Sequence, residues 1–408
     1  MNVSPNPPGK RYASEVTPLS SRLWPTLTLQ TDLVRWRRDL HQIPELGFQE
    51  HETQAYLARE LENMGLEPRA VAGTGLSVDI GSGPGRVLVR ADMDGLPIEE
   101  ATGAPYRSRH VGVMHACGHD AHMAIALGTA RLLADRVASR RGEIPEGKGF
   151  RVIFQPSEER HPGGAPAMIA GGVLKGVTHV LGCHVRASFP LGLFGSRVGV
   201  MTANSDRFTV EMRGRGGHGS TPHLTNDPVP AACEAVLALQ TVVSRRVNPR
   251  EAAVVTVSTI QGGTAPNVIG DMVTFGGTVR TLDGRVEDLV EDAISQVCRH
   301  VAEAHGVEAK VEYVRGYPSV VNTEAEVATV RQVVSELAGA QAWRELDVGM
   351  GGEDFSYYLK ERPGVFWILG TQKDGGGGQH TATFDLDERA LPDGVSVMTE
   401  TALSLAQA

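Results

Sequence analysis

The segment HACGHDAH contains five side chains of the types that bind transition metals. They are His115, Cys117, His119, Asp120 and His122. Imidazole, thiolate and carboxylate groups are the usual protein ligands of zinc and related ions. So many of them in one short segment, at the expected start of a helix, are costly to pack without an ion. The segment therefore predicts a metal site.

Four carboxylates follow two apolar runs. Asp92 and Asp94 stand in VLVRADMDGLPI, and Glu158 and Glu159 stand in FQPSEER. The two-residue period of a strand turns Asp92 and Asp94 to one side, so one could bind a metal while the other orients a ligand. Successive side chains diverge, so one of Glu158 and Glu159 could bind a metal while its neighbour transfers protons. A simple turn and a solvated acidic loop are the structural alternatives.

Two isolated histidines are weaker candidates. His184 in GCHV follows the apolar run 179–182, and His380 in QHTATFD follows the glycine run 375–378. Alone, each is more typical of a hydrogen-bonded structural histidine than of a metal ligand. The carboxyl rim of one sheet would bring them together with the other candidates. Together these side chains could hold two metal ions.

A glycine-rich segment, GRGGHGSTPH, contains His218. Its glycines match the dinucleotide-binding pattern G-x-G-x-x-G between Gly214 and Gly219. We reject a dinucleotide site because the pattern requires an immediately following helix, which Pro222 and Pro228 delay.

A later segment, GGTAPNVIGDMVTFGGTVRT, offers two groups that could bind a carboxylate. Asn267 and Arg280 could both donate hydrogen bonds to a substrate carboxylate, and a guanidinium suits bidentate capture. A structural salt bridge is an almost equally good explanation of Arg280.

The elements that would position these residues alternate between strands and helices. Helical patterns occupy 31–62 and 119–137, and strands are expected at 76–80, 86–90 and 151–155. This alternation predicts an α/β fold with a mostly parallel sheet flanked by helices. Such sheets bind ligands outside the carboxyl ends of their strands, where the candidate residues would lie.

A second folding pattern interrupts the first. From 204 to 318 the expected order is β-α-β-β-α-β, the ferredoxin-like pattern, with its first helix at 227–247, and a strand follows at 365–369. A complete unit inserted into an α/β chain is typical of a second, α+β domain. We predict a discontinuous metal-binding domain at 19–203 and 319–408, an inserted domain at 204–318, and an N-terminal tail at 1–18.

Composition narrows the functional classes. The 408 residues are 41% hydrophobic and 21% charged, which is typical of globular proteins and excludes a disordered chain. The net charge of -9 disfavours nucleic acid and anionic membranes as partners, and the apolar runs are too short to span a bilayer. Small molecules are therefore the better candidates for a partner. Four scattered cysteines make disulfides unlikely, and an N-terminus without secretory features indicates a cytoplasmic protein.

Over nearly its whole length the chain resembles the amidohydrolase branch of the aminoacylase and carboxypeptidase G metallopeptidase family. This branch includes hippurate hydrolases, N-acetyl-diaminopimelate deacetylases and auxin-conjugate hydrolases. The resemblance rests on RRDLHQIPELGFQE, RADMDGLPI, HACGHDAHM, QPSEE, GCHV, GGHGSTPH, NVI followed by GTVR, GGEDFSYY and QHTATFD. Ser157 replaces a commoner Ala, Arg160 and His161 occupy a usually glycine-rich stretch, and Gly270 stands where Pro is common. Substrate preference is therefore what the resemblance defines least.

The resemblance implies two divalent metal ions per subunit, with zinc, manganese, cobalt or nickel as candidates. The implied ligands are Cys117, His119, Glu159, His184 and His380. Glu158 would be the general base and Asp94 an orienting group, while Asp92 has no assigned role. Glu353 and Asp354 would lie at the rim of the site or behind the ligands.

The inserted domain resembles a dimerisation lid. His218 would reach the active site of a partner subunit and stabilise an oxyanion there, and Asn267 and Arg280 would bind the substrate carboxylate. A homodimer through the lid domain, or a tetramer built from it, would follow.

The implied function is a metal-dependent amidohydrolase. It would cleave the amide bond of N-acyl amino acids or related small conjugates by metal-activated water, with Glu158 as the base. A dipeptidase or carboxypeptidase with the same two-metal centre is one alternative. An inactive binding protein on the same fold is the other.

Overall fold

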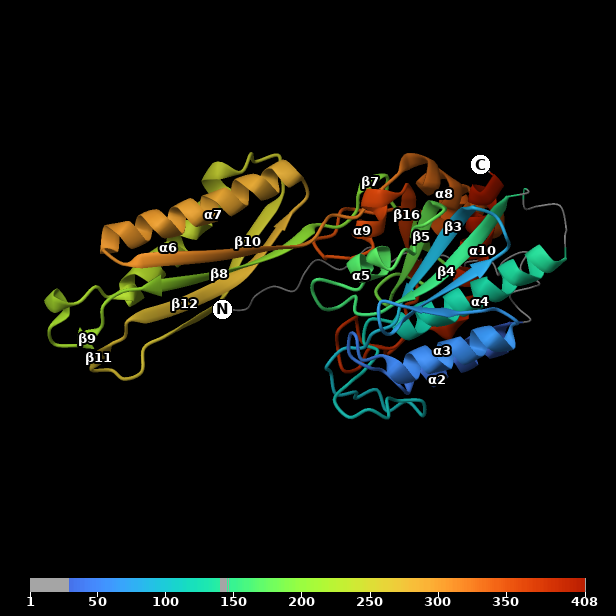
Figure 1. Cartoon of the computed structure of the whole chain (residues 1–408), viewed down its shortest axis with the longest axis horizontal. Helices are drawn as coiled ribbons and strands as arrows, with labels where there is room; N and C mark the ends of the chain where they lie inside the picture. Colours follow the sequence, from blue (N-terminus) through green and yellow to red (C-terminus); the bar gives the residue numbers. More distant parts are fainter. Residues whose placement is uncertain (1–28, 140–144, 146, 408) are drawn as a thin grey trace.

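The computed structural model describes residues 29–139, 145 and 147–407. The tail that we predict at 1–18 lies outside these residues. Figure 1 shows two bodies joined by a narrow connection, one built on an eight-stranded sheet and the other on a four-stranded sheet. Within the described ranges, no helix combines the length and the apolar character needed to cross a membrane.

The eight-stranded sheet has the order β1-β2-β4-β3-β5-β16-β6-β15. Its central strands β4, β3, β5 and β16 run parallel, and antiparallel pairs flank them. The central strands are apolar because both faces are covered; every residue of GVFWILG in β16 is buried. The prediction of a mostly parallel sheet is confirmed. The strand bounds are β1 Arg69–Val71, β2 Gly75–Ile80, β3 Gly85–Asp92, β4 Lys148–Gln155, β5 Val177–Arg186, β6 Phe194–Ser196, β15 Trp343–Glu345 and β16 Gly364–Gly370.

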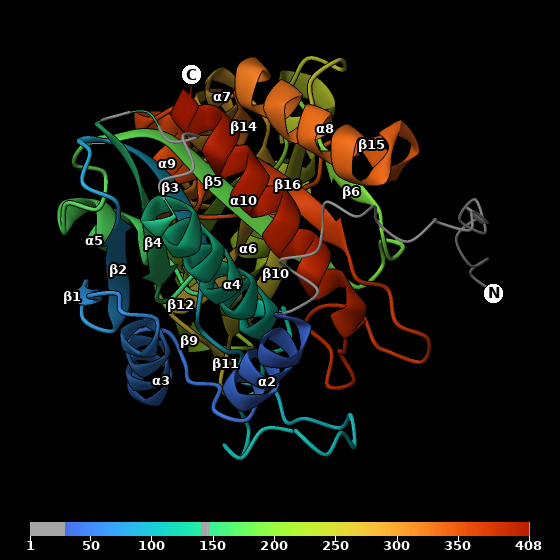
Figure 2. The same cartoon turned by 90° about the vertical axis from the view of Figure 1, so that its right-hand side faces the viewer.

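Helices pack on both faces of this sheet. One face is covered by α2 Gln30–His41, α3 His51–Asn63, α4 His119–Ala138, α8 Glu324–Ala338 and α10 Leu391–Gln407. The short helices α5 Ala165–Ala170 and α9 Ser356–Glu361 pack on the other face. In Figure 2, α4 lies between α2 and α10, which agrees with its burial along most of its length.

The chain reverses its direction across the sheet at β3. From β3 it passes through α4 to β4 on one side, and from β4 through α5 to β5 on the other side of β3. A crevice forms at the carboxyl ends of the strands where the strand order reverses in this way. Asp92, Glu158 and His184 come at or just beyond the carboxyl-terminal parts of β3, β4 and β5, so the topology brings them to one rim.

The four-stranded sheet is antiparallel, with the order β10-β12-β8-β13. Its elements follow the predicted β-α-β-β-α-β pattern, and α6 and α7 pack with the sheet in one apolar core. The ferredoxin-like prediction is confirmed, whereas the boundaries at 204 and 318 remain a proposal. The elements are β8 Asn204–Arg213, α6 Pro228–Thr241, β10 Ala253–Gly262, β12 Met272–Thr281, α7 Gly284–His305 and β13 Glu308–Tyr317.

Three smaller pieces complete the fold. β9 Gly217–His218 pairs with β11 Val268–Ile269 at the end of the second body that lies farthest from the large sheet (Figure 1). β7 Gly199–Val200 pairs with β14 Val321–Asn322 near the connection. The predicted helix over 227–247 ends as an α-helix at Thr241 and continues as a π-helical turn to Arg246.

A buried ion-pair network fixes the start of α4. Arg37 of α2 is fully buried, and its guanidinium contacts Asp120 at 2.8 Å, Asp385 at 3.2 Å and Glu388 at 3.3 Å. His41 contacts the same oxygen of Asp120 at 2.7 Å. Burial opposes ionisation of Asp120, but the charges of Arg37 and His41 lower its pKa well below the usual range. The motif RRDLHQ therefore anchors the turn that carries the neighbouring metal-ligand candidates.

We expect Asp120→Asn to lower the free energy of unfolding by about 3 to 5 kcal/mol, because it removes one partner of a buried ion pair. The lowered pKa means that the carboxylate stabilises the fold above the unfolded-state pKa of about 4, and that this contribution is lost as the pH falls below it. The difference in the free energy of unfolding between wild type and variant should therefore become smaller at acid pH. Denaturant titrations followed by tryptophan fluorescence at several pH values measure both effects.

The matched control is Asp32→Asn on α2, since Asp32 pairs with Arg35 at the surface. An exposed pair contributes less than about 1 kcal/mol. Equal losses for the two variants would contradict a special role of the Asp120 network.

Candidate metal centre and substrate pocket

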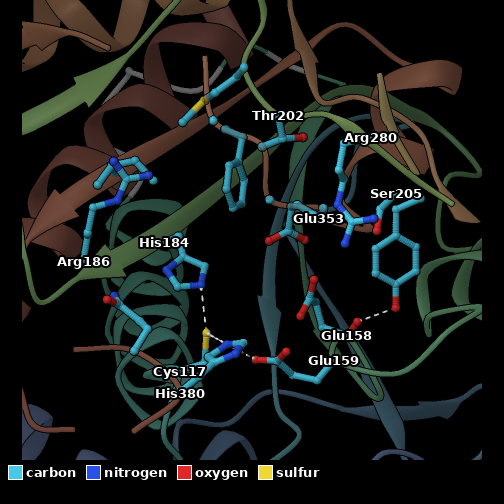
Figure 3. A pocket seen from close by; sticks show the side chains of 18 of the residues that line it. Cys117, Glu158, Glu159, His184, Arg186, Thr202, Ser205, Arg280, Glu353 and His380 are labelled. Atoms are coloured by element: carbon cyan, nitrogen blue, oxygen red, sulfur yellow. Dashed lines mark hydrogen bonds and ion pairs between the residues drawn. The ribbon is translucent and has the colours of Figure 1, made fainter. Parts of the chain in front are cut away.

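A pocket of about 500 Å³ opens at the carboxyl rim of the large sheet, beside the connection between the two bodies. β5 and the loop after β4 supply His184, Glu158 and Glu159 to its lining, the residue before the N-cap of α4 supplies Cys117, and β12 of the second body supplies Arg280. Figure 3 shows the first four side chains converging with His380 on one part of the pocket, with Arg280 across from His184. Segments far apart in the sequence thus meet at the predicted rim.

The closest group of donor atoms surrounds the sulfur of Cys117. His184 Nε2 and His380 Nε2 each lie 3.3 Å from Cys117 Sγ. His380 Nε2 also lies 3.1 Å from a carboxylate oxygen of Glu159. One thiol, two imidazoles and one carboxylate therefore face a common point, which is the donor chemistry of a transition-metal site.

His119 supplies a further nitrogen, and we call the five side chains of Cys117, His119, Glu159, His184 and His380 the donor group. His119 Nδ1 lies 2.9 Å from the backbone oxygen of Asp94 and 3.2 Å from the Asp94 carboxylate, so Nδ1 carries the proton. Its Nε2 is buried without a hydrogen-bond partner among the described residues and lies 3.9 Å from Glu159. A carboxylate that holds one ring nitrogen and frees the other is the usual arrangement behind a metal-bound histidine. This geometry supports an orienting role for Asp94.

Gly118 lies between two of the donor residues, Cys117 and His119, and its conformation allows both to face the site. Its φ of 96° lies in the left-handed region, and a Cβ there would lie 2.4 Å from a methyl group of Val185. Only glycine fits such a conformation at such a close approach. Helix α4 begins immediately afterwards, so Cys117 precedes the helix and His119 opens it.

Asp92 lies in a separate, fully buried chain of hydrogen bonds. One of its oxygens contacts His122 Nδ1 at 2.6 Å, and the other accepts from Arg90 at 2.6 Å. His122 Nε2 in turn accepts the backbone N–H of Val185 at 2.9 Å. Asp92 and His122 lie close enough to His119 to form a metal-binding group with it. However, both carboxylate oxygens of Asp92 and both ring nitrogens of His122 already have hydrogen-bond partners. Their geometry instead fixes β5 beside β3, next to His184.

Glu158 is buried beside the donor group. Burial, followed by the charges of Glu353 and Glu159, raises its pKa well above the usual range. The hydroxyl of Tyr317 donates to the backbone oxygen of Glu158 at 2.5 Å. A buried carboxyl with a raised pKa has the properties of a proton-transfer group at neutral pH.

The loop that carries Glu158 is held in a strained conformation. Ser157 has a φ of 53°, and its N–H donates to Glu50 at 2.9 Å. Gly47 packs so closely over this turn that a Cβ would lie 2.4 Å from the Ser157 hydroxyl oxygen. The segment ELGFQE therefore clamps the turn from which Glu158 and Glu159 project.

The electrostatics of the donor group fit a divalent cation. Burial and the carboxylates of Glu159 and Glu158 raise the pKa of Cys117 well above the usual range. Burial alone would lower the pKa of His119. The negative charges of Asp92, Asp94 and Glu159 have the larger effect and raise this pKa to about 10. Without a cation the surplus negative charge therefore holds protons on both groups. A bound cation would replace those protons.

Two predicted residues lie away from the pocket. Both are exposed: His218 lies in β9 and Asn267 immediately precedes its partner strand β11, at the far end of the second body (Figure 1). Arg280 does line the pocket, where it donates to the backbone oxygen of Val279 at 2.9 Å. In the part of the chain that the structure describes, no carboxylate lies within ion-pair distance of Arg280, so its environment does not favour the salt-bridge alternative.

Three residues of the site were not predicted from the sequence. Tyr317 contacts Glu158 across 159 positions of chain, a contact that no local pattern reveals. Arg90 and Arg186 did carry a signal, because each stands two residues from a candidate, Asp92 or His184, on the same strand. The two-residue period turns both toward the same side as that candidate.

The mostly parallel sheet, the inserted antiparallel domain and the donor group at the carboxyl rim define a metallopeptidase type of hydrolase. Residues 88–404 match Peptidase family M20/M25/M40, and the chain belongs to this family. The prediction of a hydrolase of linear amide bonds from this family is confirmed.

Relatives of known name match almost the whole chain. It is 41% identical over 370 residues to N-acetyl-L-cysteine deacetylase of Bacillus subtilis, covering 89% of this chain and 86% of the relative. It is 40% identical over 375 residues to N-acetyldiaminopimelate deacetylase of Bacillus pumilus, covering 90% and 96%. The crystal structure of the Bacillus subtilis YXEP protein, described as a dinuclear metal-binding peptidase, matches with a TM-score of 0.80 and 34% identity, covering 94% of this chain and 99% of that one.

We expect Asp94→Asn to weaken metal binding by about 10- to 100-fold, since the variant weakens the partner that orients His119. Calorimetric titration of metal-free protein with zinc and with manganese measures the change. Asp347→Asn is the matched control, because Asp347 lines the same pocket but belongs to none of the donor groups among the described residues. Equal affinities for wild type and Asp94→Asn would contradict an orienting role.

Proposed function

We propose that the protein is a metal-dependent amidohydrolase that removes the acyl group from N-acyl amino acids. The observation that carries this proposal is a buried glutamate, Glu158, beside a thiol, imidazole and carboxylate donor group in a pocket that also contains the unpaired guanidinium of Arg280. The two deacetylases described above act on substrates of this class, and each covers most of the chain.

The donor group would hold two divalent ions. Their ligands would be Cys117, His119, Glu159, His184 and His380. Two such ions lower the pKa of water and polarise a carbonyl group when they are bound. The mixed sulfur, nitrogen and oxygen set is compatible with zinc, manganese, cobalt or nickel, and a thiol among the ligands favours softer ions.

Glu158 would take a proton from the attacking water and deliver it to the nitrogen of the leaving amine. Its buried position and its carboxylate neighbours favour the protonated form, so the accepted proton is held until the amide bond breaks. The hydrogen bond from Tyr317 and the strained turn at Ser157 fix the backbone on both sides of this transfer. Asp94 would keep His119 in the tautomer that leaves Nε2 free.

Arg280 would bind the carboxylate of the amino-acid portion. A guanidinium can donate two parallel hydrogen bonds to a carboxylate, and Arg280 has no carboxylate partner among the described residues. This contact would orient the substrate so that its amide faces Glu158. Aligning the reacting groups in this way is a large part of enzymatic rate acceleration.

His218 and Asn267 would act on the pocket of a second copy of the chain. Both are exposed at the far end of the second domain, too distant from their own pocket to contact a substrate there. Exposed apolar side chains on the same domain, including Leu237, Val254 and Ile260, would be covered in a homodimer formed through this lid domain. In that arrangement His218 would donate to the oxyanion and Asn267 would assist Arg280.

We expect Glu158→Gln to retain its metal ions and to lose about 10²- to 10⁴-fold in kcat, because the amide cannot accept the proton. A panel of N-acetyl amino acids, hippurate and dipeptides, assayed after loading with each candidate metal, measures the loss and separates deacylation from dipeptide cleavage. Metal content per chain is measured in parallel by mass spectrometry.

Glu62→Gln is the matched control, since Glu62 is an exposed glutamate on α3. This variant should leave both kcat and the metal content unchanged. Normal turnover by Glu158→Gln would remove Glu158 from the mechanism. Faster cleavage of dipeptides than of N-acyl amino acids by the wild type would replace the proposed function with that of a peptidase.

A further inference from the structure

Arg186 is a half-buried guanidinium that the proposed mechanism does not use. It is the last residue of β5 and lines the substrate pocket. In the part of the chain that the structure describes, no carboxylate lies within ion-pair distance of it and its side chain makes no hydrogen bond. A partly desolvated cation without a partner is costly, so this position calls for an anion supplied from outside the chain.

The other buried guanidinium groups do not share this property. Arg37, Arg90 and Arg151 are fully or almost fully buried, and each contacts at least one carboxylate at 2.8 Å or less. Arg186 and Arg280 are exceptions, and both line the same pocket. Two other half-buried arginines, Arg197 and Arg362, also lack a carboxylate partner among the described residues, but they donate to the backbone oxygens of Leu346 and Val177 and neither lines the pocket.

Arg186 and Arg280 lie on opposite sides of the donor group. Arg186 stands two residues after His184 on β5, so both side chains point to the same side of the strand, about 7 Å apart along it. Figure 3 shows Arg186 on the His184 side of the pocket and Arg280 on the side of Ser205 and Glu158. A substrate whose amide faces the donor group thus has one guanidinium available on either side.

Part of the pocket wall beside His184 is apolar. Ile368 of β16 is the register partner of His184, and Phe366 stands two residues earlier on the same strand. Both line the pocket together with Met201. Such a wall suits the methylene groups that would separate an amide from a second carboxylate.

We propose that Arg186 binds a second carboxylate of the substrate, so that the preferred substrates are N-acyl amino acids with two carboxylates. This inference rests on the proposed function. The second carboxylate can belong to the acyl group, as in an N-succinyl amino acid, or to the amino-acid side chain, as in an N-acyl glutamate. Both present the same planar anion to the guanidinium.

Three substrates distinguish these sources. N-acetyl-L-alanine has one carboxylate, N-succinyl-L-alanine has a second on the acyl group, and N-acetyl-L-glutamate has a second on the side chain. We expect the wild type to prefer one of the last two over N-acetyl-L-alanine by roughly 10- to 100-fold in kcat/KM, the value of one charged hydrogen-bonded pair. Arg186→Gln should bring that ratio close to one, and Arg186→Lys should keep part of it, because the ammonium retains the charge but loses the bidentate geometry.

Arg107→Gln is the charge-matched control, since Arg107 is exposed and lies outside the pocket lining. It should keep the wild-type ratio. A wild type that hydrolyses N-acetyl-L-alanine as efficiently as both dicarboxylates, or an Arg186→Gln variant with the wild-type ratio, would overturn the inference.

Binding separates this inference from the proposed function. The same three compounds titrated calorimetrically into metal-loaded Glu158→Gln, with and without Arg186→Gln, measure affinity without turnover. Tighter binding of a dicarboxylate that depends on Arg186 supports the inference even where the wild type hydrolyses none of the three, an outcome that would reject only the proposed function. Equal binding of all three compounds overturns the inference whether or not they are hydrolysed.

Discussion

The guanidinium of Arg90 joins the three segments that form the floor of the pocket. It donates to Asp92 at the end of β3, to Gln155 at the end of β4, and to Glu353 and Asp354 before α9. One buried cation thus faces more carboxylates than it can neutralise. Burial raises the pKa of Glu353 to about 8 and that of Asp354 to about 6, even though Arg90 opposes both shifts. The negative surplus that remains makes the neighbouring donor group dependent on further positive charge, whether protons or metal ions.

The connection between the two domains is attached to the same floor. Tyr317, at the end of β13, donates to Glu158, and the ring of His161 packs against the Tyr317 ring at 4.0 Å. The adjacent turn is held by Asp206, which accepts from Tyr313 at 2.7 Å and from the N–H of Gly316 at 2.9 Å. The backbone of Glu158 is therefore hydrogen-bonded to the segment that joins the two domains.

Sequence periodicity predicted most of the fold because the apolar residues of its central strands and helices recur in clear runs or at regular spacing. The apolar run at 365–369 and the helix at 119–137 correspond to β16 and α4 within two residues at each end, and the inserted β-α-β-β-α-β order has the expected antiparallel sheet. The helix expected to reach 247 changes to a π-helical turn after Thr241, and residue patterns do not specify that change of hydrogen bonding.

The candidate site was predictable where residues follow strands, and not where the contact is remote. Glu158 and His184 could be assigned to one rim because β3, β4 and β5 are parallel neighbours. The distance of His218 and Asn267 from the pocket depends on how far the second domain extends, which no local pattern encodes. In the sequence, Arg186 does not differ from other arginines at the ends of strands. Its distinguishing property is three-dimensional: among the described residues, no carboxylate lies within ion-pair distance of it.

The raised pKa of Cys117 has a consequence for the redox behaviour of the protein. Oxidants attack thiolates far faster than thiols. In a metal-free centre, burial and the adjacent carboxylates keep this sulfur protonated at neutral pH. The charge surplus that would attract a cation therefore also disfavours the reactive thiolate form of this sulfur in the metal-free protein.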